Sequence, residues 1–223
     1  MPLPRARPAL QALQPTLLAR SLSTVRYVAP AGDRHLALPL VHLSLKATPP
    51  DDQHGWQSWV DRFSSKGYSS LLVEVDMDDA KARAKSSSDL LAKLEQELVR
   101  LLQGPAHSSP FPPLLFAHST AALLAETYVS SHPLSGLCLV DPLPALEAHT
   151  QAPSLFKAPL DDFNYEPGFP IAVVEAEKGR TEHRLLREFA EEDEEDSLVR
   201  RIVAKRDHDG WEKVQEWMDE HGL

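Results

Sequence analysis

The sequence of 223 residues lacks several features that would assign it to common classes of protein. Its single cysteine, Cys138, excludes a disulfide within the chain, and the apolar run from Leu134 to Val140 indicates that its thiol is buried rather than reactive. No run of about 18 apolar residues occurs, so we expect no membrane-spanning helix. Glycine-rich loops of the G-x-G-x-x-G and Walker types are also absent, which leaves nucleotide binding without support.

Metal and nucleic-acid sites have no basis in the sequence either. Apart from His118 and His208, the histidines, His42, His132 and His183 among them, show no i,i+4 pair with acids suited to a zinc site, and the acidic run 191–196 has no ligands at a fixed spacing around it. The net charge is −10, although residues 1–28 hold four arginines and no acidic residue. The rest of the chain is therefore strongly acidic and would repel phosphate backbones. We expect no metal, no cofactor and no nucleic-acid partner.

Residues 1–23 resemble a mitochondrial targeting segment, because they are basic, free of acidic residues and leucine-rich. Four of the leucines fall on one face of a helix: Leu10, Leu13, Leu17 and Leu18. The sequence RSLS at residues 20–23 is similar to sites cut by the mitochondrial processing peptidase, which would make Ser23 the approximate mature start. A disordered basic tail is the alternative, since prolines are frequent before residue 16. We predict a location in the mitochondrial matrix and one domain over residues 24–223.

After residue 23 the chain alternates between β-type and helix-type segments, which is typical of a parallel sheet covered by helices. The main β-type segments are short apolar runs suited to buried strands: 36–45, 71–75, 111–116, 134–140, 170–175 and 198–204. Residues 24–28 can supply an early antiparallel strand. Helical periodicity marks four further segments: 56–66, 88–102 with Ser88 or Asp89 as cap, 121–131 and 211–220. We predict an α/β fold with a mostly parallel sheet of about six strands, flanked by helices and without a large lid domain.

A serine stands where one predicted strand passes directly into a helix, in Ala117-His118-Ser119-Thr120-Ala121. With its flanks this segment, LLFAHSTAALLAETYVSSHPLSGLCLVDP, resembles the nucleophile elbow of the α/β-hydrolase superfamily. The G-x-S-x-G pattern of that family becomes A-H-S-T-A here, and alanine still allows strand and helix to approach closely. His118 occupies the variable position of the elbow, where it is expected to line the pocket. The resemblance covers roughly residues 36–223.

The resemblance implies a Ser-His-acid mechanism, in which a histidine takes the proton of the serine and a carboxylate orients the histidine. Ser119 would be the nucleophile and His208, in the loop expected after the last strand, the base. Two carboxylates remain open as the acid. Asp141, at the end of the strand after the nucleophile, is preferred, and Glu177, after the following strand, is the alternative.

The resemblance also implies an oxyanion hole built from backbone N–H groups. Thr120 would supply one donor and either Ala47 or Thr48 the other. Two functions follow. The protein is either a serine hydrolase that acts on a small-molecule ester or thioester, or an inactive α/β-hydrolase-like protein that binds a mitochondrial protein partner as an assembly factor. The hydrolase is preferred because Ser119 and His208 both occur at the family's positions.

Overall fold

The structure is a computed structural model, and it describes residues 23–46, 56–104, 109–178, 183–190 and 197–223. The predicted targeting segment lies outside the described residues except for Ser23. So do the expected oxyanion donors Ala47 and Thr48, and the acidic run 191–196.

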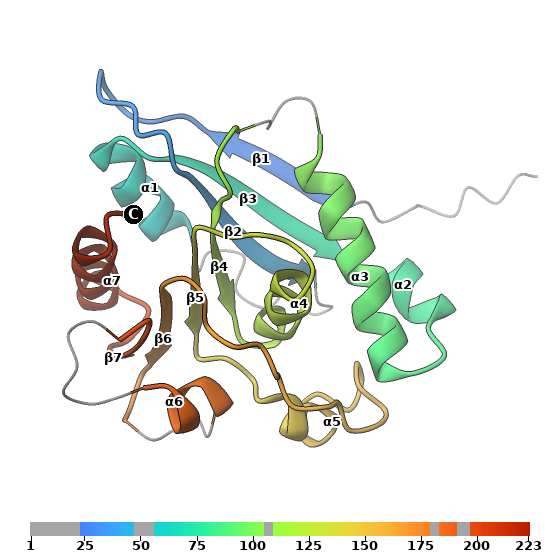
Figure 1. Cartoon of the computed structure of the whole chain (residues 1–223). Helices are drawn as coiled ribbons and strands as arrows, with labels where there is room; N and C mark the ends of the chain where they lie inside the picture. The colour runs from blue at the N-terminus through green and yellow to red at the C-terminus, as the bar shows by residue number, and fades with distance from the viewer. Residues whose placement is uncertain (1–22, 47–55, 105–108, 179–182, 191–196) are drawn as a thin grey trace, which may run out of the picture.

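A seven-stranded sheet forms the centre of the described structure, in the strand order β1-β3-β2-β4-β5-β6-β7 (Figure 1). The strands are β1 (Thr24–Val28), β2 (Pro39–Lys46), β3 (Ser69–Asp76), β4 (Leu114–His118), β5 (Gly136–Val140), β6 (Ile171–Glu175) and β7 (Val199–Val203). β1 is antiparallel to β3, and all other neighbouring pairs are parallel. The predicted α/β class with a mostly parallel sheet is therefore confirmed. The sheet has seven strands rather than the predicted six or so, because residues 24–28 form a full strand, β1, that pairs with β3 along its whole length.

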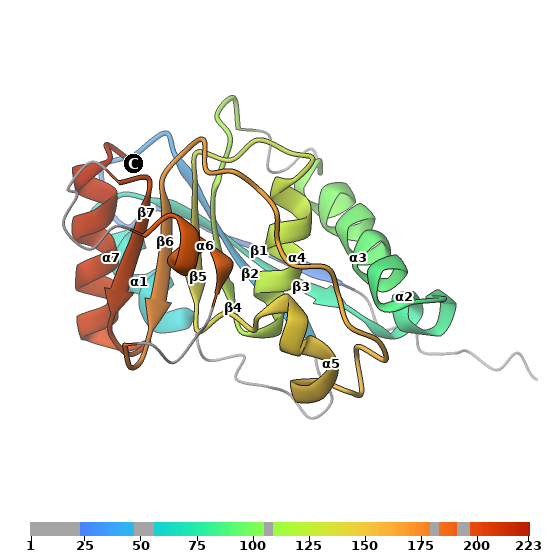
Figure 2. The ribbon, with the colours of Figure 1, turned by 60° about the horizontal axis from the view of Figure 1, so that its bottom comes forward.

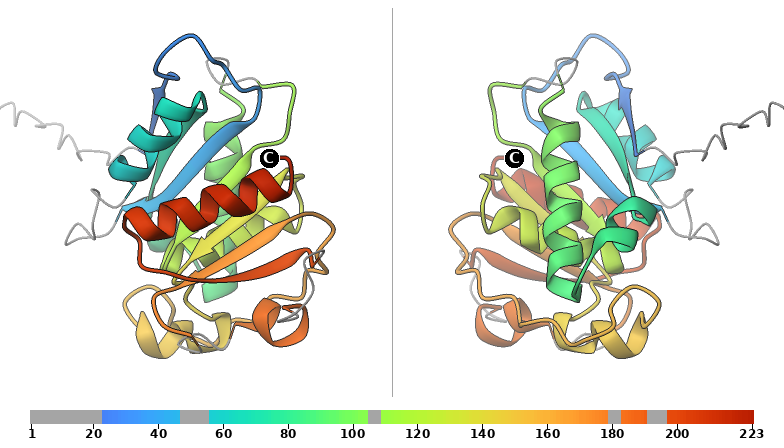
Figure 3. Two further views of the ribbon diagram at one scale, coloured as in Figure 1. Left: turned by 90° about the vertical axis from the view of Figure 1, so that its left-hand side faces the viewer. Right: turned by 90° about the vertical axis from the view of Figure 1, so that its right-hand side faces the viewer.

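Helices cover both faces of the sheet (Figure 2, Figure 3). α1 (Gln57–Lys66) and α7 (His208–Glu220) pack on one face, and α3 (Ser87–Leu102) and α4 (Thr120–Val129) on the other. Three short helices follow strand ends in the sequence: α2 (Asp78–Arg83), α5 (Ala148–Gln151), which continues the 3-10 turn η2 (Ala145–Glu147), and α6 (Arg184–Glu188). These were not predicted, because so few residues carry no helical periodicity. No helix in the described ranges has the length and hydropathy to cross a membrane.

Two apolar cores flank the sheet, because alternate residues of its strands point to opposite faces. In β2, Leu40 packs toward α1 and α7, whereas Val41 and Leu43 pack toward α3 and α4. Burial on both faces explains why the strands appear in the sequence as nearly continuous apolar runs. Cys138 of β5 is fully buried, and this burial raises the pKa of its thiol, so it is the buried residue that the sequence predicts.

Helix ends follow local signals in the chain. α1 ends at Gly67, which adopts φ 101° and donates its N–H to the carbonyls of Phe63 and Ser64, as its glycine predicts. The cap of α3 is Ser86 rather than Ser88 or Asp89, because the Ser86 hydroxyl accepts the N–H of Asp89 at 3.1 Å.

Candidate active site

Ser119 lies at the junction of β4 and α4 in a backbone conformation that residues with a side chain rarely adopt, with φ 51° and ψ −123°. Its N–H donates to the Val140 carbonyl at 3.0 Å. Its own carbonyl accepts the N–H groups of Ala122 at 3.1 Å and Leu143 at 3.3 Å. These bonds tie the turn to β5 and to the loop after it. The structure therefore has the strand–turn–helix that the sequence predicts, with the serine at its tip.

Small side chains allow this turn to pack. Ala117, before the elbow, is fully buried, and Ala121, after it, is 2% exposed. Both belong to the core on the α3 and α4 side of the sheet. Alanine therefore meets the steric requirement that glycine meets in the G-x-S-x-G pattern, since the helix starts against the strand with little space between them.

The conformation of Ser119 predicts a difference between two substitutions that both remove its hydroxyl. Ser119→Gly is expected to have a free energy of unfolding about 1 kcal/mol higher than Ser119→Ala, because only glycine relieves the positive φ. Urea denaturation of the two variants measures this difference. Ser58, an exposed position inside α1, provides the control. There the glycine variant is expected to be about 1 kcal/mol less stable than the alanine variant, because glycine disfavours a helix. Equal stability of the two Ser119 variants would show that the backbone at residue 119 is not strained.

His208 is the first residue of α7, a correction to the prediction that it lies in the loop before this helix. Asp207 causes the earlier start, because its Oδ1 accepts the N–H groups of Asp209 at 3.1 Å and Gly210 at 3.4 Å. The aspartate before a helical run is an N-cap signal that could have been found in the sequence.

The loop between β7 and α7 runs from the β7 edge of the sheet back toward β2. At its start, Ala204 donates its N–H to the Glu175 carbonyl of β6 at 2.9 Å. Further along, the Arg206 guanidinium lies 5.9 Å from the ring centre of Trp56, whose indole N–H donates to the Leu43 carbonyl of β2 at 3.3 Å. β4 lies between β2 and β5, so this path passes the strand that immediately precedes Ser119.

The structure places Ser119 and His208 after the carboxyl ends of their strands without joining their side chains. In the part of the chain that the structure describes, no hydrogen bond links the Ser119 hydroxyl to His208. The imidazole is 55% exposed and contacts Glu212 on the next turn of α7, a residue that the sequence analysis did not consider. Glu212 could have been identified in the sequence, because it lies four residues after His208 and such residues are neighbours on a helix surface.

The two predicted acids occupy different environments. Asp141 has φ 42°, donates its N–H to the Val174 carbonyl at 2.8 Å, and accepts the Ala176 N–H on Oδ1 at 3.2 Å. Its carboxylate is therefore held between the ends of β5 and β6. Glu177, two residues beyond β6, is exposed. Among the described residues, neither acid is hydrogen-bonded to His208.

Thr120 lies where an oxyanion donor is expected. It is the first residue of α4 and is half-buried. The N–H groups of the first helical turn have no acceptor within the helix, and the helix dipole adds partial positive charge there. The backbone N–H of Thr120 can therefore stabilise an anion that forms beside Ser119.

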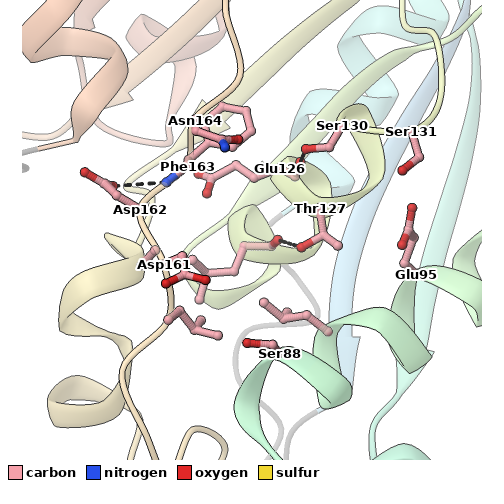
Figure 4. Close-up of a pocket in the computed structure, with 14 residues that line it drawn as sticks. Ser88, Glu95, Glu126, Thr127, Ser130, Ser131, Asp161, Asp162, Phe163 and Asn164 are labelled. Carbon is pink, nitrogen blue, oxygen red and sulfur yellow. Dashed lines mark hydrogen bonds between the residues drawn. The ribbon is translucent and has the colours of Figure 1, made fainter.

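A cavity of about 280 Å³ lies between α3, α4 and the segment 160–164 (Figure 4). Thr127 and Glu126 line it from α4, and Glu95 lines it from α3. The Glu126 side chain points toward the segment that carries Phe163 (Figure 4). This cavity shares α4 with the elbow but lies along later turns of the helix.

Glu126 forms a buried pair with His183 that the sequence analysis did not predict. Glu126 Oε1 lies 2.7 Å from His183 Nε2. Since the Leu185 N–H donates to Nδ1 at 3.3 Å, Nε2 carries the proton and donates it to the carboxylate. Burial raises the pKa of Glu126, and the histidine opposes this increase. The pair holds the start of α6 against α4. The described residues contain no group of three or more His, Cys, Asp or Glu that could hold a metal ion.

No sequence-family model and no curated protein sequence matches the chain. Solved structures with the same architecture include the thermophilic esterase Est2 of Thermogutta terrifontis, solved with butyrate bound (TM-score 0.59, 12% identity, 90% of each chain covered). Est1E from Butyrivibrio proteoclasticus is similar over 89% of this chain and 94% of its own, with TM-score 0.56 and 10% identity. The Bacillus megaterium epoxide hydrolase is similar over 88% and 96%, with TM-score 0.53 and 10% identity. The chain therefore has the α/β-hydrolase fold.

Proposed function

We propose that this protein is a serine hydrolase that cleaves a small-molecule ester or thioester. The observation that carries the proposal is the strained backbone of Ser119, at φ 51° and ψ −123°. Such a conformation costs on the order of 1–3 kcal/mol, which glycine would largely avoid. A serine kept in this conformation at a strand-to-helix turn presents its hydroxyl beyond the end of β4, as a nucleophile requires.

Each residue has a defined role in the proposed reaction. Ser119 Oγ forms a bond to the carbonyl carbon while its proton passes to His208, and the Thr120 N–H stabilises the oxyanion. The alcohol or thiol leaves with that proton, and water then cleaves the acyl-serine ester to release the acid and restore Ser119. From the sequence, Asp141, or Glu177 as the alternative, is the acid expected to orient His208, although neither is hydrogen-bonded to it among the described residues. The esterases among the similar structures support an ester as the substrate class.

The second candidate is an inactive α/β-hydrolase-like protein that binds a mitochondrial protein partner as an assembly factor. It is favoured by the lack, among the described residues, of a hydrogen bond between Ser119 and His208. For both candidates we propose the mitochondrial matrix as the location, because residues 1–23 are basic and leucine-rich. A reporter fused to residues 1–23 that stays in the cytosol would contradict this location.

Labelling with a fluorophosphonate tests the hydrolase, because this reagent reacts with activated serine nucleophiles. We expect the wild-type protein to be labelled and Ser119→Ala to lose labelling by more than about 100-fold, since the attacking oxygen is gone. Ser58→Ala, which removes an exposed hydroxyl from α1, is the matched control and should label like the wild type. Absence of labelling in the wild-type protein, or equal labelling of Ser119→Ala, would contradict the hydrolase and favour the binding protein.

A further inference from the structure

The contacts of His208 identify a carboxylate that neither strand end supplies. Because α7 begins at His208, Glu212 lies one turn further along the same face of the helix. Its Oε1 is 3.2 Å from His208 Nδ1. A carboxylate at Nδ1 keeps the proton of a neutral imidazole on that nitrogen and leaves the lone pair of Nε2 available as a base. We propose that Glu212 is the positioning residue that orients His208 in this way, an inference that rests on the proposed hydrolase function.

The other acids near the start of α7 have different partners. Asp207 uses Oδ1 to cap the helix, and Asp209 accepts Lys213 Nζ on Oδ2 at 3.0 Å. In the described ranges of the chain, Glu212 is the only carboxylate within ion-pair distance of the imidazole of His208. Glu212 is therefore assigned as the acid that orients His208 because it contacts the imidazole, and not because it follows a strand.

Contacts with α1 anchor the start of α7 beside this ion pair. The Asp207 carbonyl accepts the indole N–H of Trp59 in α1 at 3.1 Å. The Trp211 ring is nearly perpendicular to the imidazole, at 82° with 6.2 Å between ring centres, and itself packs edge-on against Phe63 at 5.7 Å. Glu212 and Trp211 thus both contact the imidazole of His208.

Exposure sets the size of the expected effect. The His208 and Glu212 side chains are 55% and 56% exposed, so water screens the attraction between them. We expect Glu212→Ala to slow the rate of fluorophosphonate labelling about 3-fold, less than the loss caused by removing a buried triad acid. For a turned-over ester the decrease should appear in kcat rather than in KM, because the contact orients the base and does not touch the substrate.

The experiment combines labelling rates with nitrogen-15 NMR of His208, whose imidazole shifts report which ring nitrogen carries the proton. The variants are Glu212→Ala, Glu212→Asp as the conservative change, and Glu216→Gln, an exposed acid one turn further along α7, as the control. Slower labelling and a loss of the Nδ1–H form in Glu212→Ala, partly restored in Glu212→Asp and absent in Glu216→Gln, would support the proposal.

Two results would overturn it, and they are distinguishable from failure of the hydrolase proposal. If the wild-type protein labels at Ser119 but Glu212→Ala labels at the same rate, Glu212 does not position the base and the hydrolase proposal stands. If the wild-type protein does not label, the hydrolase proposal fails. The NMR measurement then decides alone, because an unchanged Nδ1–H population in Glu212→Ala would show that the contact does not set the tautomer.

Discussion

Replacement of His42 by phenylalanine is expected to make the protein markedly less sensitive to acid. His42 is fully buried in β2, and burial lowers the pKa of its imidazole from 6.5 to about 3. Between these two pH values the unfolded chain binds a proton that the folded chain does not. Stability should therefore fall as the pH drops below 6.5, by as much as about 1.4 kcal/mol per pH unit from this residue alone, and should be unaffected by it above 6.5.

The surroundings of His42 explain why the charged form is excluded. Its ring stacks on Phe116 with 4.8 Å between ring centres and a 14° interplanar angle, and Trp56 and Phe63 are its other ring neighbours. Nε2 lies 3.3 Å from the Ser70 hydroxyl, whereas Nδ1 is buried without a hydrogen-bond partner among the described residues. None of these contacts comes from a carboxylate, so the cost of burying a charged imidazolium prevails and lowers the pKa.

Urea denaturation at pH 7, 5.5 and 4.5 measures this effect. The unfolding free energy of His42→Phe should decrease less between pH 7 and 4.5 than that of the wild type, by about 2 kcal/mol or more. His35→Gln removes an exposed histidine and should keep the wild-type dependence. His42→Gln is a second neutral variant in case phenylalanine does not fit. Parallel pH dependences of the wild type and both His42 variants would show that His42 does not titrate on unfolding.

Gly210→Ala is expected to destabilise the protein by about 3 kcal/mol, an unusually large effect for one methyl group. A Cβ at Gly210 would lie 2.0 Å from the Lys205 carbonyl oxygen and 3.4 Å from Trp59 Cζ2. The Lys205 oxygen cannot simply rotate away, because it is backbone and accepts the Asp207 N–H at 2.8 Å. The loop or the first turn of α7 would have to shift, and His208 with it.

The free energy of unfolding from urea denaturation is the measurement for this variant as well. Gly168→Ala is the matched control, since the nearest atom to its new Cβ is the Tyr165 hydroxyl at 3.9 Å. It should change stability by less than about 0.5 kcal/mol or increase it slightly. If Gly210→Ala were as stable as the wild type, this result would contradict the close approach of the Lys205 carbonyl to the first turn of α7.

Local sequence information was enough to predict the elbow. A buried strand, a serine flanked by small residues and a helix follow one another between Leu114 and Val129, and each signal lies within a few residues of the structure that it predicts. The same holds for the glycine stop of α1 at Gly67. The predicted start of α7 at residue 211 was wrong, because the prediction did not include Asp207 as the N-cap. This cap is also a local signal in the sequence.

The roles of the predicted site residues remain predictions for a physical reason. The predicted triad of Ser119, His208 and either Asp141 or Glu177 combines side chains that follow different strands, and their relative positions depend on packing of the whole sheet rather than on their neighbours in sequence. Asp141 and Glu177 both follow strand ends, so the sequence could not rank them by contact. The contact between His208 and Glu212 became visible only when the helix start was known.

The α/β class, the buried strands and the serine at the strand-to-helix turn could all be predicted without coordinates, because they depend on periodicity and on neighbouring residues. Which groups meet across the chain depends instead on how the whole molecule packs. His183 reaches Glu126 across 57 positions, and Trp59 reaches the Asp207 carbonyl across 148. Burial is likewise a property of the packed molecule. It gives His42 a lowered pKa that no feature of its own segment specifies.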